Sequence, residues 1–344
     1  MSAEPPRPGS AAEAHLGGVR AGLEAAGVDV ETVWAAHGRE RKVRAIARFQ
    51  LRGLGRLWHA DVVYSRWHVL DVSHVLAARL LGRPIVLEVN GTTDDLVLAN
   101  PALARLSPVL RRWTAWVFAR AAHVIVVSPG LEEWVHDLAP RTSTTYLANG
   151  APRSIPVTSA ALDPPFAVFV GELARHQGIH TLLAARRSDA WPTGLGLVVV
   201  GGGAEEATVA EAHARGDVDY RGRVARDEAH ALLRAAVLSI SPQTATLARN
   251  RLGITPLKVA ESMMAGVPVV GSDLPGMREM IGRAPAGRTV EADVPEALAA
   301  AVAAVASEHA DPAALRRYAE DELSWEAVAR RTVSILEEVR DRRN

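Results

Sequence analysis

The chain contains no cysteine, no apolar run approaching the roughly 20 residues that span a bilayer, and no excess charge of either sign. Without cysteine it can form neither a disulfide framework nor a thiolate metal site. Lys+Arg and Asp+Glu both number 39, which argues against a dominant attraction to nucleic acid or to an anionic membrane. The start, MSAEPPRPGS, lacks the apolar segment of a signal peptide. These absences favour a cytoplasmic protein that binds no nucleic acid.

Several chemistries also lack their usual residue patterns. The histidines show no metal-ligand spacing, and no serine stands in a nucleophile elbow. Glycines 201–203 follow an apolar run but lack the GxGxxG spacing of a dinucleotide-binding loop, so we interpret them as the end of a strand. We therefore expect no metal, no bound cofactor and no hydrolase triad.

The order of predicted elements indicates an α/β protein. The length of 344 residues allows two domains of ordinary size. Strand and helix patterns alternate in both halves, which predicts parallel, doubly wound sheets. In the first half we expect strands at 28–35, 61–66, 84–90 and 123–128, helices at 10–26, 72–82 and 104–122, and a closing segment at 143–150. In the second half we expect strands at 166–171, 196–203, 219–222, 238–242 and 267–273, and helices at 178–188, 204–214, 226–236, 293–306, 311–321 and 325–341.

Residues 255–273, TPLKVAESMMAGVPVVGSD, form the most informative segment. Thr255 suits a helix N-cap, Pro256 the first helical position and Gly266 the helix end, and an apolar strand follows. Glu261 then stands behind a helix N-terminus, which attracts anions such as phosphate. A carboxylate one to two turns into the helix can accept both hydroxyls of a ribose. The segment therefore predicts a site for a nucleoside diphosphate.

Two residues of this segment have a simpler interpretation. Glu261 could form a surface ion pair with Lys258, three residues earlier, worth a few tenths of a kcal/mol. The surrounding motif favours ribose binding instead. Lys258 shares this helix face, and both a phosphate-binding role and a solvated surface lysine are consistent with the sequence.

The segment resembles the donor-site signature of the retaining GT-B glycosyltransferases of family four, in which a Pro-Leu-Lys-x-x-Glu-x-Met-Ala-x-Gly-x-Pro-Val-Val run is common. Other segments follow in that family's order and spacing. They are PIVLEVNG at 84–91, ARAAHVIVVSPGL at 119–131, ANG at 148–150, FVGELARHQGIHTLLAA at 169–185, VVVGGG at 198–203, DYRGRV at 219–224, LPGMREMI at 274–281 and LSWEAVARRTVSILEEV at 323–339.

The resemblance implies two Rossmann-like domains that face each other across a cleft. We expect an acceptor-side domain at 1–152 and a nucleotide-sugar domain at 153–324, with a helix at 325–344 that crosses back to the first domain. The proline-rich stretch 151–165 would be the linker. The first domain would begin at its glycine-rich loop, Pro8 to Ser10. We therefore expect either a start upstream or a first sheet without its usual first strand.

The implied activity is transfer of a sugar from a nucleoside diphosphate donor to a small-molecule or glycan acceptor, with retention and without a metal. Glu261 would bind the ribose, and helix-start N–H groups and basic side chains the diphosphate, while a loop lies beside the base. The residues expected to bind the donor are Ile254, Thr255, Leu257, Lys258, Arg175, Gly222, Arg223 and Val224. Gly9, Ser10 and Asn90 would face the acceptor. Lys258 and Asn90 are the residues we expect to act in catalysis.

Asn90 comes directly after an expected strand, where open α/β sheets bind ligands. Much of the family has histidine there. Asparagine keeps the hydrogen bonding and loses proton transfer, and a turn Asn before Gly91 is an equally simple interpretation.

Three departures bear on catalysis. The family's first glutamate of a pair corresponds to Gly253, and its diphosphate-gripping Arg and Lys correspond to Glu172 and Gln177. A carboxylate beside a diphosphate is repulsive. The basic or polar residues that could substitute are Arg175, His176, Arg249, Arg251 and Lys258. These departures leave two alternatives open. The chain could be a catalytically degenerate partner subunit or, less favoured, a nucleotide-sugar epimerase.

Residues 110–120, LRRWTAWVFAR, mix tryptophan with arginine. That composition is compatible with a membrane interface. We favour an ordinary helix packed on the sheet, so membrane association is not the preferred interpretation.

Overall fold

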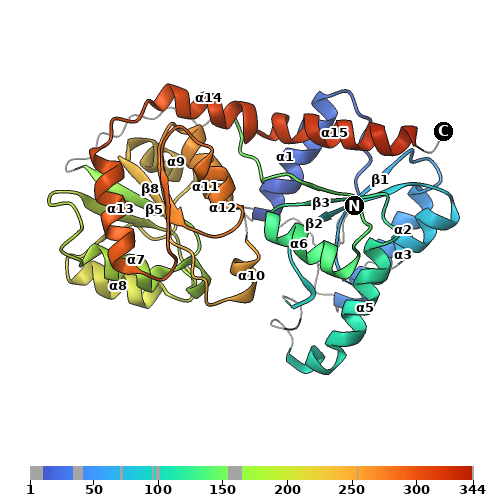
Figure 1. Ribbon diagram of the computed structural model, residues 1–344, viewed down its shortest axis with the longest axis horizontal. Helices are drawn as coiled ribbons and strands as arrows, with labels where there is room; N and C mark the ends of the chain where they lie inside the picture. Colours follow the sequence, from blue (N-terminus) through green and yellow to red (C-terminus); the bar gives the residue numbers. More distant parts are fainter. Residues whose placement is uncertain are drawn as a thin grey trace. The chain divides into compact units, whose positions relative to one another are not determined.

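The computed structural model describes residues 11–33, 42–69, 73–94, 97, 101–153, 165–253 and 255–342 (Figure 1). The chain divides into two compact units. Unit 1 comprises Met1–Ala148 and Trp325–Asn344, and unit 2 comprises Asn149–Ser324. Each unit has a parallel sheet flanked by helices, as the alternating sequence pattern predicts. The linker predicted at 151–165 lies mostly outside the described residues.

Unit 1 contains a four-stranded parallel sheet in the order β1-β2-β3-β4. Its strands are β1 (Val63–Arg66), β2 (Ile85–Val89), β3 (His123–Val126) and β4 (Thr144–Tyr146). Within the described part of the chain no strand precedes β1. The strand expected at 28–35 is wrong for residues 28–33, which have no ladder partner. Alternating apolar residues form a strand only where a neighbouring strand accepts their hydrogen bonds.

The helices of unit 1 cover both faces of this sheet. They are α1 (Ala11–Ala25), α2 (Lys42–Arg56), α3 (Ser73–Leu80), η1 (Pro101–Leu106), α5 (Ser107–Phe118), α6 (Pro129–Leu138) and α15 (Trp325–Asp341). The single helix expected at 104–122 is instead a 3₁₀ segment followed by the shorter α5. Helix α2 was not expected. Helix α6 starts where Ser128 accepts from the Leu131 N–H at 3.2 Å, a side-chain cap followed by proline.

One face of the sheet packs on the C-terminal helix. Val86 of β2 and Ile125 of β3 form an apolar cluster with Ile335 and Val339 of α15. Helix α1 packs closely against α15, and a Cβ on Gly18 would overlap the indole of Trp325. The helical segment expected at the end of the chain thus belongs to the core of unit 1.

Unit 2 contains a six-stranded parallel sheet in the order β10-β9-β8-β5-β6-β7. Its strands are β5 (Phe166–Val170), β6 (Gly196–Val200), β7 (Asp219–Tyr220), β8 (Leu238–Ser241), β9 (Val269–Ser272) and β10 (Arg288–Val290). Because all are parallel, the loops that follow β5, β6, β7 and β8 meet at one edge of the sheet.

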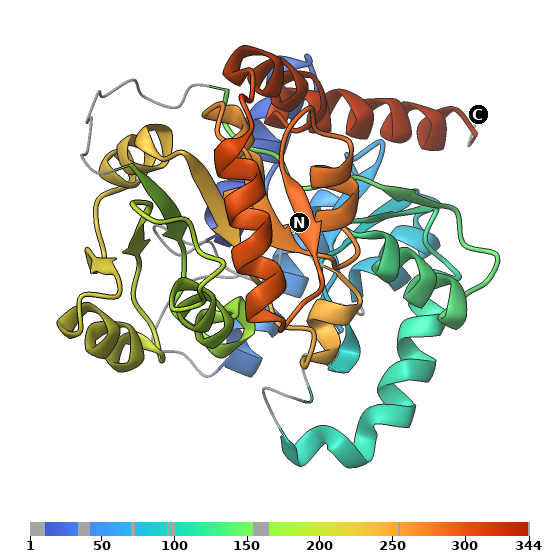
Figure 2. The same cartoon turned by 60° about the vertical axis from the view of Figure 1, so that its left-hand side comes forward.

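Helices cover both faces of the second sheet (Figure 2). Helices α7 (Ile179–Arg186), α8 (Glu206–Ala214) and α13 (Pro295–Ser307) share an apolar core with one face. Helices α9 (Arg226–Ala235), α11 (Leu257–Met264) and α12 (Met277–Gly282) contact the strands from the other, and α14 (Pro312–Glu322) packs on α11. Two short segments complete the unit, η2 (Arg175–Gln177) and α10 (Ala248–Arg251).

Candidate functional site

Helix α11 starts one residue later than the sequence predicts. Its first residue is Leu257, and Pro256 is the N-cap, in an extended conformation with φ −65° and ψ 131° and without a side-chain cap. Thr255 does not cap the helix because Asn149 engages it: its Oγ1 accepts from the Asn149 N–H at 3.2 Å and its carbonyl from Asn149 Nδ2 at 2.8 Å. The first N–H groups of a helix have no intrahelical acceptor. The start of α11 therefore offers donors to an anion.

Asn149 holds this helix start in place. It belongs to the ANG segment at 148–150, which is near the helix only in the folded protein. Thr255 is 2% exposed, and its hydroxyl is engaged by the Asn149 N–H. Leu257 is half-buried at the first helical position, and Ile254 lies outside the described residues.

Glu261 lies one turn into α11 with its side chain 19% exposed. Its Oε1 accepts from Arg226 Nη2 at 3.0 Å and lies 3.9 Å from Nε2 of the buried His230. Both contacts come from α9, so this helix fixes the direction of the carboxylate. The surface ion pair with Lys258 that the sequence allowed is not the contact that Glu261 makes.

The half-buried side chain of Lys258 extends toward the strand β5. Its Nζ donates to Gln177 Oε1 at 2.8 Å and lies 3.9 Å from the centre of the Phe169 ring. Burial lowers the pKa of Lys258 from 10.5 to about 7, although the charge of Glu261 opposes this shift. A Cβ on Gly171 would lie 2.8 Å from this nitrogen, so the glycine after β5 makes room for the ammonium group.

Gln177 therefore has a defined partner at a place where the resembled family has lysine. Its amide oxygen accepts from Lys258, and the cation comes from α11 and not from the segment after β5. Glu172 and Arg175 are both exposed on that segment. The structure thus brings Lys258 and Gln177 together, whereas Arg175 stands at the surface of η2.

The loop after β7 is tied to the glycine turn after β6. Gly222, with φ +65°, accepts through its carbonyl from the Gly201 N–H at 2.8 Å. Arg223 is exposed, and its Nε would lie 2.7 Å from a Cβ on Gly202, so its side chain extends over that residue. Val224 is half-buried. The loop expected to face the base therefore has a fixed backbone at the carboxyl edge of the sheet.

Glycines 201–203 serve close backbone packing. A Cβ on Gly201 would overlap the carbonyl oxygen of Gly171, and one on Gly203 would lie 2.5 Å from that of Leu173. This agrees with the interpretation of the turn as the end of a strand.

Gly253 is likewise required by the backbone. It has φ +82°, and a Cβ there would overlap the carbonyl oxygen of Pro275. A glutamate cannot occupy this position in the observed backbone. The loop of this chain therefore requires glycine at position 253.

Asn90 belongs to a buried polar cluster in unit 1. Its Nδ2 donates to Glu88, as does the Tyr64 hydroxyl, and His15 Nε2 lies 2.7 Å from Glu88 Oε1. Burial acts to raise the pKa of Glu88, but the charge and hydrogen bond of His15, the charge of Arg66 and the hydrogen bond of Tyr64 together outweigh it and lower that pKa to about 2. Asn90 is thus oriented by an ionised carboxylate. Gly9 and Ser10 lie outside the described residues.

Sequence reasoning missed Asn149, Arg226, His230, Glu88 and His15. Glu88 and Asn149 stand inside the motifs PIVLEVNG and ANG, where their buried or clamping roles had no separate signal. Arg226 and His230 are four residues apart on α9, a spacing that places them on one helix face.

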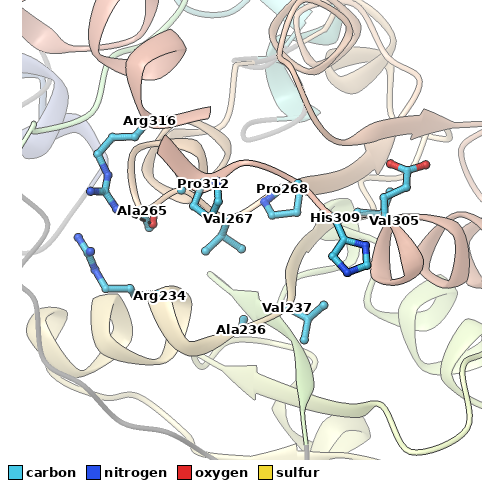
Figure 3. Close-up of a pocket in the computed structure, with 13 residues that line it drawn as sticks. Arg234, Ala236, Val237, Ala265, Val267, Pro268, Val305, His309, Pro312 and Arg316 are labelled. Atoms are coloured by element: carbon cyan, nitrogen blue, oxygen red, sulfur yellow. Dashed lines mark hydrogen bonds between the residues drawn. The ribbon is translucent and has the colours of Figure 1, made fainter. Parts of the chain in front are cut away.

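A cavity of about 380 Å³ in unit 2 lies at the opposite edge of the sheet, where Val237 and Pro268 precede β8 and β9 (Figure 3). Arg234 and Arg316 point toward each other there. Arg316 donates to the carbonyls of Met264 and Ala265 at the end of α11, at 3.3 and 3.4 Å. This cavity is distinct from the donor candidates.

Within the described ranges, no group of three or more His, Cys, Asp or Glu side chains could hold a metal ion. None of the described helices is both long and apolar enough to cross a membrane.

Comparison with known proteins identifies the family. Residues 5–154 match the model of Glycosyltransferase Family 4, and residues 164–308 match that of Glycosyl transferases group 1. The chain is 28% identical over 307 residues to an alpha-maltose-1-phosphate synthase of Mycobacterium tuberculosis, covering 78% of this chain and 74% of the relative.

Solved structures agree on the fold. Anabaena Alr3699/HepE, solved in complex with UDP, has a TM-score of 0.70 and 17% identity, with 98% of each chain covered. AviGT4, a glycosyltransferase involved in avilamycin A biosynthesis, has a TM-score of 0.62 and 17% identity, with 95% of this chain and 89% of that chain covered. The chain belongs to the group 1, family 4 glycosyltransferases and has their GT-B fold of two Rossmann-like domains.

Proposed function

We propose that this glycosyltransferase transfers a sugar from a nucleoside diphosphate donor to an acceptor hydroxyl, with retention at the anomeric carbon and without a metal ion. The observation that carries the proposal is the placement of Lys258 and Glu261 on α11. Both lie within two turns of a helix start that has no side-chain cap, at the edge of the sheet where ligands bind.

Each group of the site has a matching part of the donor. Glu261, which α9 directs through Arg226, accepts the ribose hydroxyls. The N–H groups of Leu257 and Lys258 and the Lys258 ammonium bind the diphosphate. The backbone of Gly222 to Val224 lies beside the base.

The chemistry follows from this placement. The bond between the anomeric carbon and the diphosphate oxygen breaks as the acceptor oxygen bonds to that carbon, and the acceptor proton is released. Negative charge grows on the leaving diphosphate. The helix start and Lys258 neutralise that charge as it develops, which lowers the barrier without a bound cation. The products are a glycoside and a nucleoside diphosphate.

The proposal assigns the acceptor to unit 1 and to Asn90. Glu88 accepts from the Asn90 amide nitrogen, so the Asn90 carbonyl oxygen is directed elsewhere and can accept from an acceptor hydroxyl. The acceptor class is a glycan or a small natural product. The compartment we propose is the cytoplasm, with which the absence of cysteine is consistent.

Thermal stability against a panel of nucleoside diphosphates and their sugars tests the donor site. UDP is the first choice because HepE was solved with it. We expect one nucleotide to raise the melting temperature of the native chain and not that of Glu261→Ala. The matched control is Glu279→Ala, a glutamate of α12 that pairs with Arg283 on the surface. An equal shift in native chain and Glu261→Ala would contradict the assignment.

Two outcomes would point to the alternatives considered from the sequence. If no nucleotide shifts the melting temperature and a protein co-purifies, the chain is a partner subunit. If the donor sugar isomerises without any acceptor, the chain is an epimerase. The curated relatives are named as synthases and transferases, which supports transfer.

A further inference from the structure

The cavity of about 380 Å³ in unit 2 combines an apolar floor with basic side chains. Ala236, Val267 and Pro268 line it and are buried, and Val237 is half-buried beside them. A concavity of this volume is large enough for a small ligand, and an apolar lining favours a ligand with an apolar part. The basic groups decide which further chemistry such a ligand must have.

Two guanidinium groups converge on one side of this cavity. Arg234 belongs to the last turn of α9 and Arg316 to α14, and both are half-buried. Figure 3 shows their side chains pointing toward each other. Burial lowers the pKa of Arg234, and the charge of Arg316 lowers it further. The two positive charges therefore repel each other, and an anion between them would turn this repulsion into attraction.

The carboxylate of the lining already has another partner. Among the described residues that line the cavity, Glu308 is the one acid, and its Oε1 accepts from Arg288 Nη2 at 2.5 Å. Arg288 lies on β10 and does not line the cavity. The lining thus carries two permanent positive charges and one carboxylate that is paired outside it, which favours a ligand with negative charge.

Hydrogen bonds hold Arg316 in place before any ligand binds. Its Nε and Nη2 donate to the carbonyls of Met264 and Ala265 at the end of α11. Its Nη1 carries two further N–H groups, and the planar guanidinium presents them in a fixed direction. Binding the end of α11 accounts for Arg316 alone. It does not account for the second guanidinium, that of Arg234, which is directed at the first.

This cavity lies at the far end of the helix that carries the donor candidates. Leu257 begins α11, and Ala265 ends it beside Arg316. At a rise of about 1.5 Å per residue the two ends are about 12 Å apart. The start of the helix belongs to the edge of the sheet where the strands end, whereas the cavity lies where β8 and β9 begin. A ligand of the cavity therefore occupies a site separate from that of the donor.

We propose that this cavity binds a small phosphate monoester whose organic part is apolar. The phosphate lies between Arg234 and Arg316, whose two charges match a dianion and whose N–H groups donate to its oxygens. The organic part covers Val237 and Val267, which lie between the arginines and His309 in Figure 3. His309 is exposed on the far side and contacts the end of the ligand. The proposal does not depend on the transfer reaction.

Calorimetric titration of the full chain with phenyl phosphate tests the proposal. Inorganic phosphate and phenol, each representing one half of this probe, are titrated for comparison. We expect phenyl phosphate to bind at least tenfold more tightly than inorganic phosphate, because only the ester also covers the apolar floor. Phenol should show no measurable binding. Equal affinities for phosphate and its phenyl ester, or no binding of the ester, would overturn the proposal.

Single substitutions locate the binding site. Arg234→Gln and Arg316→Gln should each weaken the binding of phenyl phosphate at least tenfold, because each removes a charge-assisted contact. Arg234→Gln is the decisive variant, since Arg316→Gln also loses the hydrogen bonds to the end of α11. An unchanged thermal transition verifies that Arg234→Gln is folded.

The matched control is Arg317→Gln, which removes the same charge from the neighbouring position of α14. The Arg317 side chain is 67% exposed and lies 3.8 Å from Asp311. This variant should bind phenyl phosphate as the native chain does. An equal loss in Arg317→Gln and Arg234→Gln would indicate a general effect of net charge and would contradict the proposal.

A donor-site variant distinguishes the two phosphate sites. The binding that Arg234→Gln loses should persist in Lys258→Met, because Lys258 lies at the other end of α11. Binding of phenyl phosphate that is lost in Lys258→Met and kept in Arg234→Gln would place the probe at the donor site, and the proposal would be wrong. Loss with Arg234 and persistence without Lys258 support it whether or not any nucleotide binds, so the outcome is independent of the proposed transfer.

Discussion

Replacing Lys258 by methionine is expected to stabilise the fold and to weaken the binding of the donor. The ammonium group lies against Phe169 and donates to Gln177, and burial lowers its pKa from 10.5 to about 7. At about pH 7 that shift corresponds to a cost of up to about 4 kcal/mol in the free energy of unfolding. Methionine also loses the hydrogen bond to Gln177 and the contact with the Phe169 ring, which offsets about 1 kcal/mol or more of this gain in stability. The net stabilisation should be roughly 2–3 kcal/mol.

The pH dependence follows from the direction of the shift. Below about pH 7 the folded and the unfolded chain both carry a proton on Lys258. Between about pH 7 and 10.5 the unfolded chain binds more protons, so the stability of the native protein rises with pH over this window. Lys258→Met removes this contribution, and the stability advantage of the variant should shrink as the pH rises.

Chemical denaturation at several pH values measures the stability, and calorimetric titration with the nucleotide that shifts the melting temperature measures binding. We expect Lys258→Met to bind that nucleotide at least tenfold more weakly, because a charge-assisted contact to the diphosphate is lost. A substitution that stabilises the fold and weakens ligand binding is characteristic of a residue kept for function. A variant that is less stable at about pH 7, or that binds as well as the native chain, would refute the reasoning.

Three further predictions use pairs of positions or a titration. Gly253→Ala should destabilise unit 2 by about 3 kcal/mol, whereas Gly194→Ala, which has the same φ of +82° but nothing within 4 Å, should cost only about 1 kcal/mol in the same urea titration. Gly18→Ala should lower the melting temperature through overpacking, whereas the neighbouring Gly17→Ala should raise it slightly by improving helix propensity; equal effects would argue against the described packing of α1. The pKa of Glu88 is lowered from 4.5 to about 2, so its carboxylate should contribute about 3 kcal/mol to the free energy of unfolding above about pH 4.5. This contribution should be lost as the pH falls toward 2, and an acid titration of Glu88→Gln should lack it.

The sequence predicts most of the strands and helices of both units because each has its own periodic apolar pattern. It fails where tertiary contacts decide. Thr255 is a residue type that commonly caps helices. Its hydroxyl instead accepts a hydrogen bond from the N–H of Asn149, which is distant in sequence. Residues 28–33 alternate like a strand but have no neighbouring strand to pair with.

The candidate site was predictable in part for the same reason. Lys258 and Glu261 stand in one short motif, and their shared helix follows from its spacing. The partner of each does not follow, because Gln177 and Arg226 lie on segments that only the sheet brings near α11. Gly253 looked like a lost glutamate in the sequence, and only its positive φ and the nearby Pro275 show that the backbone requires glycine there.

The low pKa of Lys258 also makes this residue a chemical handle. The chain has only two lysines, Lys42 and Lys258. An amine reacts with acylating reagents in its neutral form, and a lysine with a pKa near 7 is largely neutral at physiological pH, whereas an ordinary lysine is about 0.1% neutral. Apart from the amino terminus, an amine-selective reagent at neutral pH should therefore modify one position. That position lies in the proposed diphosphate site, so a bound donor should protect it and a covalent label should act as an inhibitor.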